Sequence, residues 1–128
     1  MLGCSSCALF LKQDYPRLLG SKEANKVSNN LYYITEYFLK LHSIGQLNTD
    51  FRDISQTIFY HTPCHLRTKE FDNPTVRLLN LIPGIMITKI SQECCGMGGA
   101  YGNEKVNYEL SNEIASRIYS QIEKNQGK

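Results

Sequence analysis

The sequence lacks a long hydrophobic run. No stretch approaches the ~18 to 20 apolar residues that a helix needs to cross a bilayer. Near Met1 there is also no basic segment followed by an apolar run, the pattern of a secretory signal. These absences argue against a membrane-spanning or secreted protein. We therefore expect a cytoplasmic protein that meets a membrane only through partners or peripherally, at its cytoplasmic face.

An excess of charge of one sign is missing too. The 128 residues carry 14 Lys and Arg against 12 Asp and Glu, a net charge of +2 that gives no reason to expect nucleic-acid binding. The densest basic stretch, Arg67 to Lys69, is followed directly by Glu70, and we predict that it is a solvated surface. No internal repeat or low-complexity tract is present. With 41% hydrophobic and 20% charged residues, the composition is that of an ordinary globular protein about one domain long.

The cysteine count does not suit a closed set of disulfides. Five cysteines leave one over after pairing. In a reducing compartment, clustered cysteines more often bind metal or carry out redox chemistry. Their positions along the chain therefore become the main evidence.

The order of the predicted elements favours an α/β fold with a small parallel sheet. Helical patterns cover about Ser5 to Leu19, Lys22 to Leu47, Pro74 to Ile82 and Tyr108 to Lys124, and strands are predicted at Thr57–Tyr60 and Ile85–Ile90. Strand, helix, strand is the order of a βαβ unit, whose sites form at the carboxyl ends of the strands. Because a cysteine loop follows each strand, the two loops can meet at one edge of the sheet.

Adjacent Cys94 and Cys95 are the most informative feature. Neighbouring cysteines do not easily form an unstrained disulfide with each other, but both thiolates can serve one polynuclear metal centre. Gly96, Gly98 and Gly99 follow, and they let the backbone approach such a centre and point N–H groups at its sulfurs. The alternative is an inert Cys pair beside a tight turn.

Cys64 lies in a loop fixed by Pro63 and flanked by His61 and His65. Either histidine can hydrogen-bond a thiolate or shuttle a proton, and either can equally be a plain surface residue. The alternative for Cys64 is a free thiol after a strand.

Cys4 and Cys7 form a Cys-x-x-Cys pair. This spacing occurs in zinc knuckles, thiol oxidoreductases and iron–sulfur proteins. At the N-terminus of a helix the macrodipole favours the thiolate form, which suits all three. A thioredoxin-like site normally has a strand before the motif, and only three residues precede it here.

The residues that carry these signals resemble the cysteine-rich CCG domain. The segments concerned are Tyr60-His61-Thr62-Pro63-Cys64-His65, the run from Cys94 to Gly102, and Asp14-Tyr15-Pro16. This domain occurs in heterodisulfide reductase and in the iron–sulfur subunits of glycolate oxidase and anaerobic glycerol-3-phosphate dehydrogenase. The iron–sulfur subunit of the last enzyme is the nearest likeness.

The resemblance implies two modules. Residues 1–50 would hold the helical end of one CCG module, with Cys4 and Cys7 as its closing ligands, and a connecting helix. Residues 51–128 would hold most of a second module, with Cys64, Cys94 and Cys95 as ligands. The closing Cys-x-x-Cys of the second module would lie beyond Lys128, so we expect an incomplete sheet and a fragment of a longer protein.

The implied function is an iron–sulfur electron-transfer subunit of a respiratory dehydrogenase or a heterodisulfide reductase-like oxidoreductase. Its cluster would be of the 4Fe–4S type, with a noncubane form left open. An FAD-containing dehydrogenase subunit would supply electrons, and a quinone or a disulfide would accept them. We do not expect this chain to be active alone.

Two alternatives remain. A zinc-stabilised structural module would use Cys and His ligands, but it leaves the adjacent Cys94 and Cys95 unexplained. A thiol–disulfide switch between Cys64 and Cys94 or Cys95 needs the two loops within disulfide reach.

Overall fold

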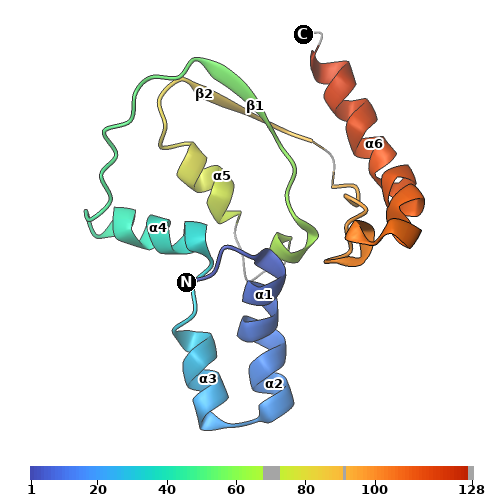
Figure 1. Ribbon diagram of the computed structural model, residues 1–128. Helices are drawn as coiled ribbons and strands as arrows, with labels where there is room; N and C mark the ends of the chain where they lie inside the picture. Colours follow the sequence, from blue (N-terminus) through green and yellow to red (C-terminus); the bar gives the residue numbers. More distant parts are fainter. Residues whose placement is uncertain (68–72, 91, 127–128) are drawn as a thin grey trace.

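A computed structural model of the chain describes residues 1–67, 73–90 and 92–126 (Figure 1). The helices are α1 (Ser5–Leu9), α2 (Tyr15–Leu19), α3 (Lys22–Asn29), α4 (Ile34–Ser43), α5 (Pro74–Leu79) and α6 (Tyr108–Gln126). The strands are β1 (Gln56–Tyr60) and β2 (Ile85–Lys89). A π-helical turn (Phe10–Asp14) joins α1 to α2, and short 3₁₀ turns lie at Cys64–Leu66, Tyr101–Asn103 and Lys105–Asn107.

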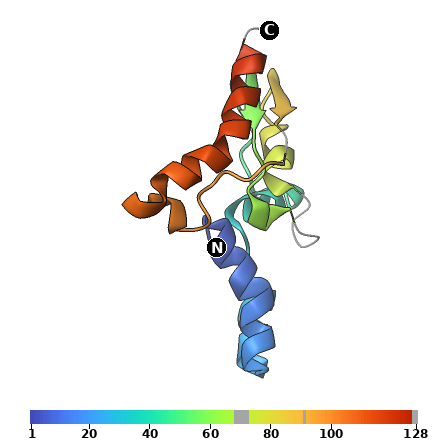
Figure 2. The same cartoon turned by 90° about the vertical axis from the view of Figure 1, so that its right-hand side faces the viewer.

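The two strands form a parallel sheet in register from Gln56 opposite Ile85 to Tyr60 opposite Lys89. Helix α5 connects them, so β1, α5 and β2 make the predicted βαβ unit. The predicted α/β fold with a small parallel sheet and flanking helices is therefore confirmed. Figure 2 shows α6 running alongside the sheet. Helix α5 is shorter than predicted and ends at Leu79, because Leu81 and Ile82 continue in a tight turn towards Pro83.

The first predicted helix is continuous, with one widened turn whose cause is Pro16. Proline has no backbone N–H, so the carbonyl of Lys12, four residues earlier, loses its helical donor. Tyr15 instead donates to the carbonyl of Phe10, one residue further back than in an α-helix. The Ser28 hydroxyl donates to the freed Lys12 carbonyl over 2.8 Å. The widened turn is thereby attached to α3, which runs back along α1 and α2 as a hairpin (Figure 1).

The prediction of one helix from Lys22 to Leu47 is wrong. The helix breaks between Asn29 and Ile34, where the chain is held by residues close to its beginning. Leu2 donates its N–H to the carbonyl of Tyr32 and accepts from the N–H of Ile34, at 2.9 and 2.8 Å. Glu36 then accepts the Tyr33 N–H and caps α4. The apolar period continues across the break, so the sequence pattern hides it.

Among the described residues few hydrophobic side chains are fully buried, and most of them lie near the cysteine loops. Ala8 of α1 and Leu66 beside the Cys64 turn are both buried and pack with Leu2, Leu9, Leu31 and Tyr33. On the other side, Ile90 beyond β2 is buried together with Ala115 and Ile118 of α6. The first group thus lies beside the Cys64 turn, and the second lines a cavity together with Cys95. None of the helices in the described ranges is both long and apolar enough to cross a membrane.

Candidate metal centre

The two cysteine loops begin where the sheet ends. Just past the paired strands, the Ile90 N–H donates to the carbonyl of Tyr60 at 3.1 Å. One step further on, Nε2 of His61 lies 2.9 Å from the carbonyl oxygen of Glu93. Cys64 and Cys94 follow these two residues. The prediction that the loops meet at one edge of the sheet is confirmed.

Arg67 makes a second connection between the loops. Its Nε donates to the carbonyl of Thr62 at 2.9 Å, and Nη2 donates to the carbonyl of Glu93 at 3.0 Å. Nη1 donates to the carbonyl of Gln92, and Nη2 also lies 3.1 Å from Nε2 of His61. The prediction of a solvated surface is wrong for Arg67, which is half-buried. Thr68, Lys69 and Glu70 of the same stretch lie outside the described residues.

The two histidines of the Cys64 loop have different surroundings. His65 is in contact with the thiol, because its Nδ1 lies 3.4 Å from the sulfur of Cys64. The same Nδ1 lies 3.2 Å from the hydroxyl of Ser6 in α1. His61 instead bonds the opposite loop. The histidine beside the thiol of Cys64 is therefore His65, and Ser6 brings the N-terminal helix to it.

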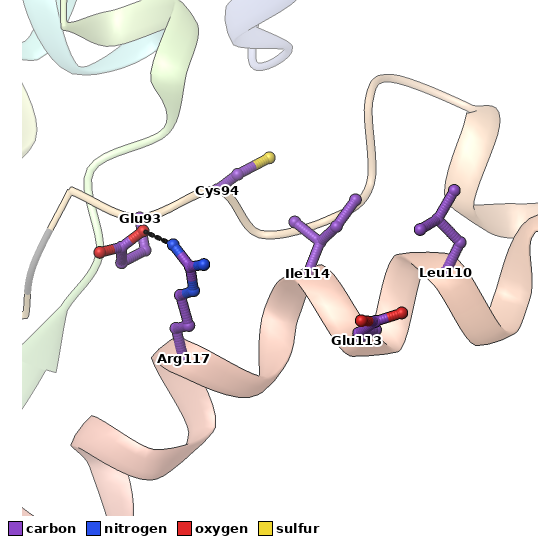
Figure 3. Close-up of a pocket in the computed structure, with 6 residues that line it drawn as sticks. All are labelled: Glu93, Cys94, Leu110, Glu113, Ile114 and Arg117. Carbon is purple, nitrogen blue, oxygen red and sulfur yellow. Dashed lines mark ion pairs between the residues drawn. The ribbon is translucent and has the colours of Figure 1, made fainter.

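The adjacent thiols of Cys94 and Cys95 open into different cavities. Cys94 lines one of about 270 Å³ with Glu93 and residues of α6, among them Ile114 and Arg117. Figure 3 shows Arg117 reaching towards Glu93, whose carboxylate is 3.7 Å away. Cys95 lines another cavity, of about 350 Å³, together with His61. The two neighbouring cysteines thus line separate cavities.

Gly96 joins the Cys94–Cys95 loop to α6. Its φ of +79° is a left-handed value, and a Cβ there would overlap the carbonyl oxygen of Ser111. The buried Ser111 hydroxyl donates to the Gly96 carbonyl at 3.0 Å. The Gly96 N–H points at the sulfur of Cys94 at 3.4 Å. The backbone at Gly96 thus lies close against α6, and its N–H faces a thiol, whereas its approach to a metal centre stays a prediction.

Gly98 and Gly99 also have positive φ angles, of +49° and +73°. At Gly99 the space where a Cβ would stand is empty, so only its backbone conformation calls for glycine.

Cys4 caps the N-terminus of α1, as the sequence suggested. Its sulfur accepts the N–H of Cys7 at 3.4 Å, and this bond, with the Cys7 thiol, lowers the pKa of Cys4. The pKa of Cys7 is raised, first by its hydrogen bond to Cys4 and then by the charge there. Tyr33 is partly buried, which raises its pKa, and the nearby Tyr60 and Cys4 add to that effect. Cys4 and Tyr60, the last residue of β1, therefore both act electrostatically on Tyr33.

These thiols suit a soft metal ion or a cluster by their chemistry. All five cysteines are free and exposed, and thiolates are the ligands preferred by zinc and iron–sulfur clusters. Hydrogen bonds from N–H groups to the sulfurs of Cys4 and Cys94 are of the kind that stabilises a thiolate ligand. Across residues 1–67, 73–90 and 92–126, however, no three ligating side chains converge on one point. The donor set fits, and the ligands would have to draw together around the metal.

Sequence reasoning missed three residues that shape this site: Ser6, Arg67 and Ser111. The partners of Arg67 and Ser111 are backbone carbonyls distant in the sequence, which no local pattern reveals. Ser111 did carry a signal, because it stands on the helical face that includes Ala115 and Ile118, where a polar residue must find a buried partner.

The fold and the paired cysteine loops define a thiol-rich α/β module. The profile of the cysteine-rich domain family, CCG, matches residues 58–128. The chain belongs to this family.

Curated relatives extend the similarity to the N-terminal half. Over 119 residues the chain is 29% identical to one subunit of the anaerobic glycerol-3-phosphate dehydrogenase of Escherichia coli K12, a match that covers 93% of this chain and 30% of the relative. One subunit of the dihydromethanophenazine:CoB–CoM heterodisulfide reductase of Methanosarcina barkeri is 32% identical over 105 residues, covering 77% and 24%. An uncharacterised iron–sulfur protein of Methanococcus maripaludis is 31% identical over 123 residues, covering 91% and 22%. The chain thus spans less than a third of these relatives. No solved structure was found to match it.

Proposed function

We propose that this chain supplies thiolate ligands to an iron–sulfur cluster in an electron-transfer subunit of an oxidoreductase. The observation that supports it most is the junction of the two cysteine loops at the sheet edge, where Cys64, Cys94 and Cys95 are all free and exposed. The names of the relatives, which include a dehydrogenase, a reductase and an iron–sulfur protein, agree with it.

In this proposal Cys64, Cys94 and Cys95 hold a cluster of the 4Fe–4S type, cubane or noncubane. When bound, the cluster would take up and release electrons. The N–H of Gly96 would remain on the sulfur of Cys94, and the positive φ of Gly98 and Gly99 would turn the loop around the cluster. His61 and His65 would orient the loop and its thiol.

Cys4 and Cys7 would belong to a neighbouring site. Their helix ends a first module within residues 1–50, and residues 51–128 form the larger part of a second, as the resemblance to the family implies. The N-cap geometry that lowers the pKa of Cys4 prepares that thiol for a metal.

The chain would work as part of a larger assembly. An FAD-containing dehydrogenase subunit is the proposed donor, and a quinone or a disulfide is the proposed acceptor. Five free, exposed thiols suit a reducing compartment, so we place the chain in the cytoplasm, with access to a membrane through its partners. Activity would need those partners.

A zinc-stabilised module is the second candidate, and one contact favours it. Ser6 joins the Cys4–Cys7 helix to His65, so thiols and an imidazole come from adjoining segments, as in mixed Cys and His zinc sites.

Anaerobic purification followed by iron, zinc and acid-labile sulfide assays separates the two candidates. We expect iron and sulfide together, lost when Cys64 or Cys95 is changed to serine. Zinc without sulfide would favour the structural module instead.

A further inference from the structure

The sheet and the cysteine loops are held together by different means. Backbone hydrogen bonds hold β1 and β2 together, and the bond from the Ile90 N–H to the carbonyl of Tyr60 continues this pairing. Further along, the carbonyls of Gln92 and Glu93 face the other loop. Arg67 donates to both carbonyls.

The guanidinium of Arg67 also holds its own loop. Its Nε donates to the carbonyl of Thr62, five residues earlier, while Nη1 and Nη2 reach the opposite loop. The donors of a guanidinium are fixed in one plane. A single side chain therefore sets the position of one loop relative to the other. Its contacts flank Cys64 in one loop and lie just before Cys94 in the other.

Charge supports the same role. The backbone carbonyls that Arg67 contacts carry no counter-charge, so within the described residues Arg67 brings positive charge between two loops of thiols. The side chain of Glu93 is turned towards Arg117 of α6, at 3.7 Å. The positive charge of Arg67 thus lies where thiolates, and a negatively charged thiolate-ligated cluster, are favoured by electrostatic attraction.

We infer that Arg67 is a positioning residue that fixes the separation of the Cys64 loop and the Cys94–Cys95 loop before any metal binds. Only the purpose of this arrangement, the preparation of a cluster site, rests on the proposed function. The arrangement itself is a property of the metal-free chain. The contributions of the geometry and of the charge of Arg67 can be measured separately. Lysine keeps the positive charge but cannot reach three carbonyls in one plane.

The experiment measures distances between spin labels on pairs of cysteines in the metal-free chain. In one set, labels stand on Cys64 and Cys94, with the other three cysteines changed to serine. In a second set, labels stand on Cys7 and Cys64, whose segments are joined through Ser6, His65 and the packing of Ala8 on Leu66.

Each set is made with Arg67, with Arg67→Gln and with Arg67→Lys. Arg17→Gln is the matched control, because Arg17 is exposed and pairs with Asp14 far from the loops.

We expect Arg67→Gln and Arg67→Lys to broaden the Cys64–Cys94 distance distribution about twofold, since the loops lose their common anchor. The Cys7–Cys64 distribution should stay unchanged, and Arg17→Gln should change neither. An unchanged Cys64–Cys94 distribution, equal broadening of both pairs, or full rescue by lysine would each overturn the inference.

A second measurement uses the unmodified chain and therefore does not depend on the folding of a variant. In the unmodified chain, the guanidinium protons of Arg67 should exchange with water more slowly than those of Arg17, by about tenfold or more. Equal exchange would contradict the inference. Because both measurements use metal-free protein, failure to bind a cluster would count against the proposed function and leave these results unaffected.

Discussion

The hydroxyl of Ser6 lies 3.2 Å from Nδ1 of His65, although the two residues are 59 positions apart. The same imidazole nitrogen is 3.4 Å from the sulfur of Cys64. Ser6 stands between Cys4 and Cys7, so this contact joins the Cys-x-x-Cys helix to the Cys64 loop. Ala8, one residue after Cys7, packs on Leu66 beneath the same loop. The N-terminal cysteines and Cys64 are therefore structurally connected.

We predict that Ser6→Ala lowers the free energy of unfolding by about 0.5–1.5 kcal/mol, the net value of one hydrogen bond. Urea unfolding of the metal-free chain measures it. Ser5→Ala, in the same helical turn, is the control and should have a smaller effect. If both variants are equally stable, the Ser6–His65 contact contributes nothing.

Gly96 and Gly99 allow a matched comparison of backbone strain and close packing. Gly99→Ala meets only the cost of a left-handed conformation, about 1–2 kcal/mol, because nothing lies near its Cβ position. Gly96→Ala adds an overlap with the carbonyl of Ser111 and should cost more, on the order of 3–5 kcal/mol. Unfolding free energies of the two variants test this order. Equal losses would show that the loop is not seated on α6 as described.

Ser111 should be sensitive because its partner is buried. Changing it to alanine leaves the carbonyl of Gly96 without its hydroxyl donor, and we expect a loss of about 1–3 kcal/mol. Ser116→Ala is the control on the same helix, since Ser116 is exposed and its hydroxyl donates to the carbonyl of Glu113 within α6. Its effect should stay within about 0.5 kcal/mol. A loss of the same size in both variants would contradict the account.

The two thiols of the Cys-x-x-Cys pair should titrate in a fixed order. The N–H of Cys7 lowers the pKa of Cys4, whereas the bond to Cys4 raises that of Cys7. Cys4 should therefore react with iodoacetamide at lower pH than Cys7 in the metal-free chain. Any stability gained from the Cys4 thiolate is present above the ordinary thiol pKa and is lost as the pH falls through the lowered one.

Mass spectrometry of the alkylated peptides across a pH series gives the two profiles. In a Cys7→Ser variant the backbone N–H remains, so the lowered pKa of Cys4 should largely persist. Alkylation of Cys7 at the lower pH would reverse the assignment.

Much of the fold follows from local patterns. The β-prone runs at Thr57–Tyr60 and Ile85–Ile90, with Pro74 beginning a helix between them, are enough to predict the parallel pair. The break after Asn29 was not predictable in this way, because its cause is the pairing of Leu2 with Tyr32 and Ile34. Hydrogen bonds between distant segments do not change the periodic pattern of apolar residues in the sequence.

In the candidate site, too, some residues could be predicted from the sequence and others could not. Cys64, Cys94 and Cys95 stand out by residue type and spacing, and their meeting at one edge follows from the rule for parallel sheets. Arg67 does not stand out, because a basic residue two positions before Lys69 has the pattern of a solvated surface. Only the folded chain shows that its guanidinium faces the carbonyls of Gln92 and Glu93.

Anaerobic reconstitution with iron and sulfide tests the central claim most directly. A small thiol in the buffer can complete the fourth position of a 4Fe–4S cluster held by Cys64, Cys94 and Cys95. Electron paramagnetic resonance of the reduced sample, with iron and acid-labile sulfide assays, should show a cluster with equal iron and sulfide. Changing Cys64, Cys94 or Cys95 to serine should remove it. Zinc without sulfide, or a cluster that survives all three substitutions, would contradict the claim that these thiols are its ligands.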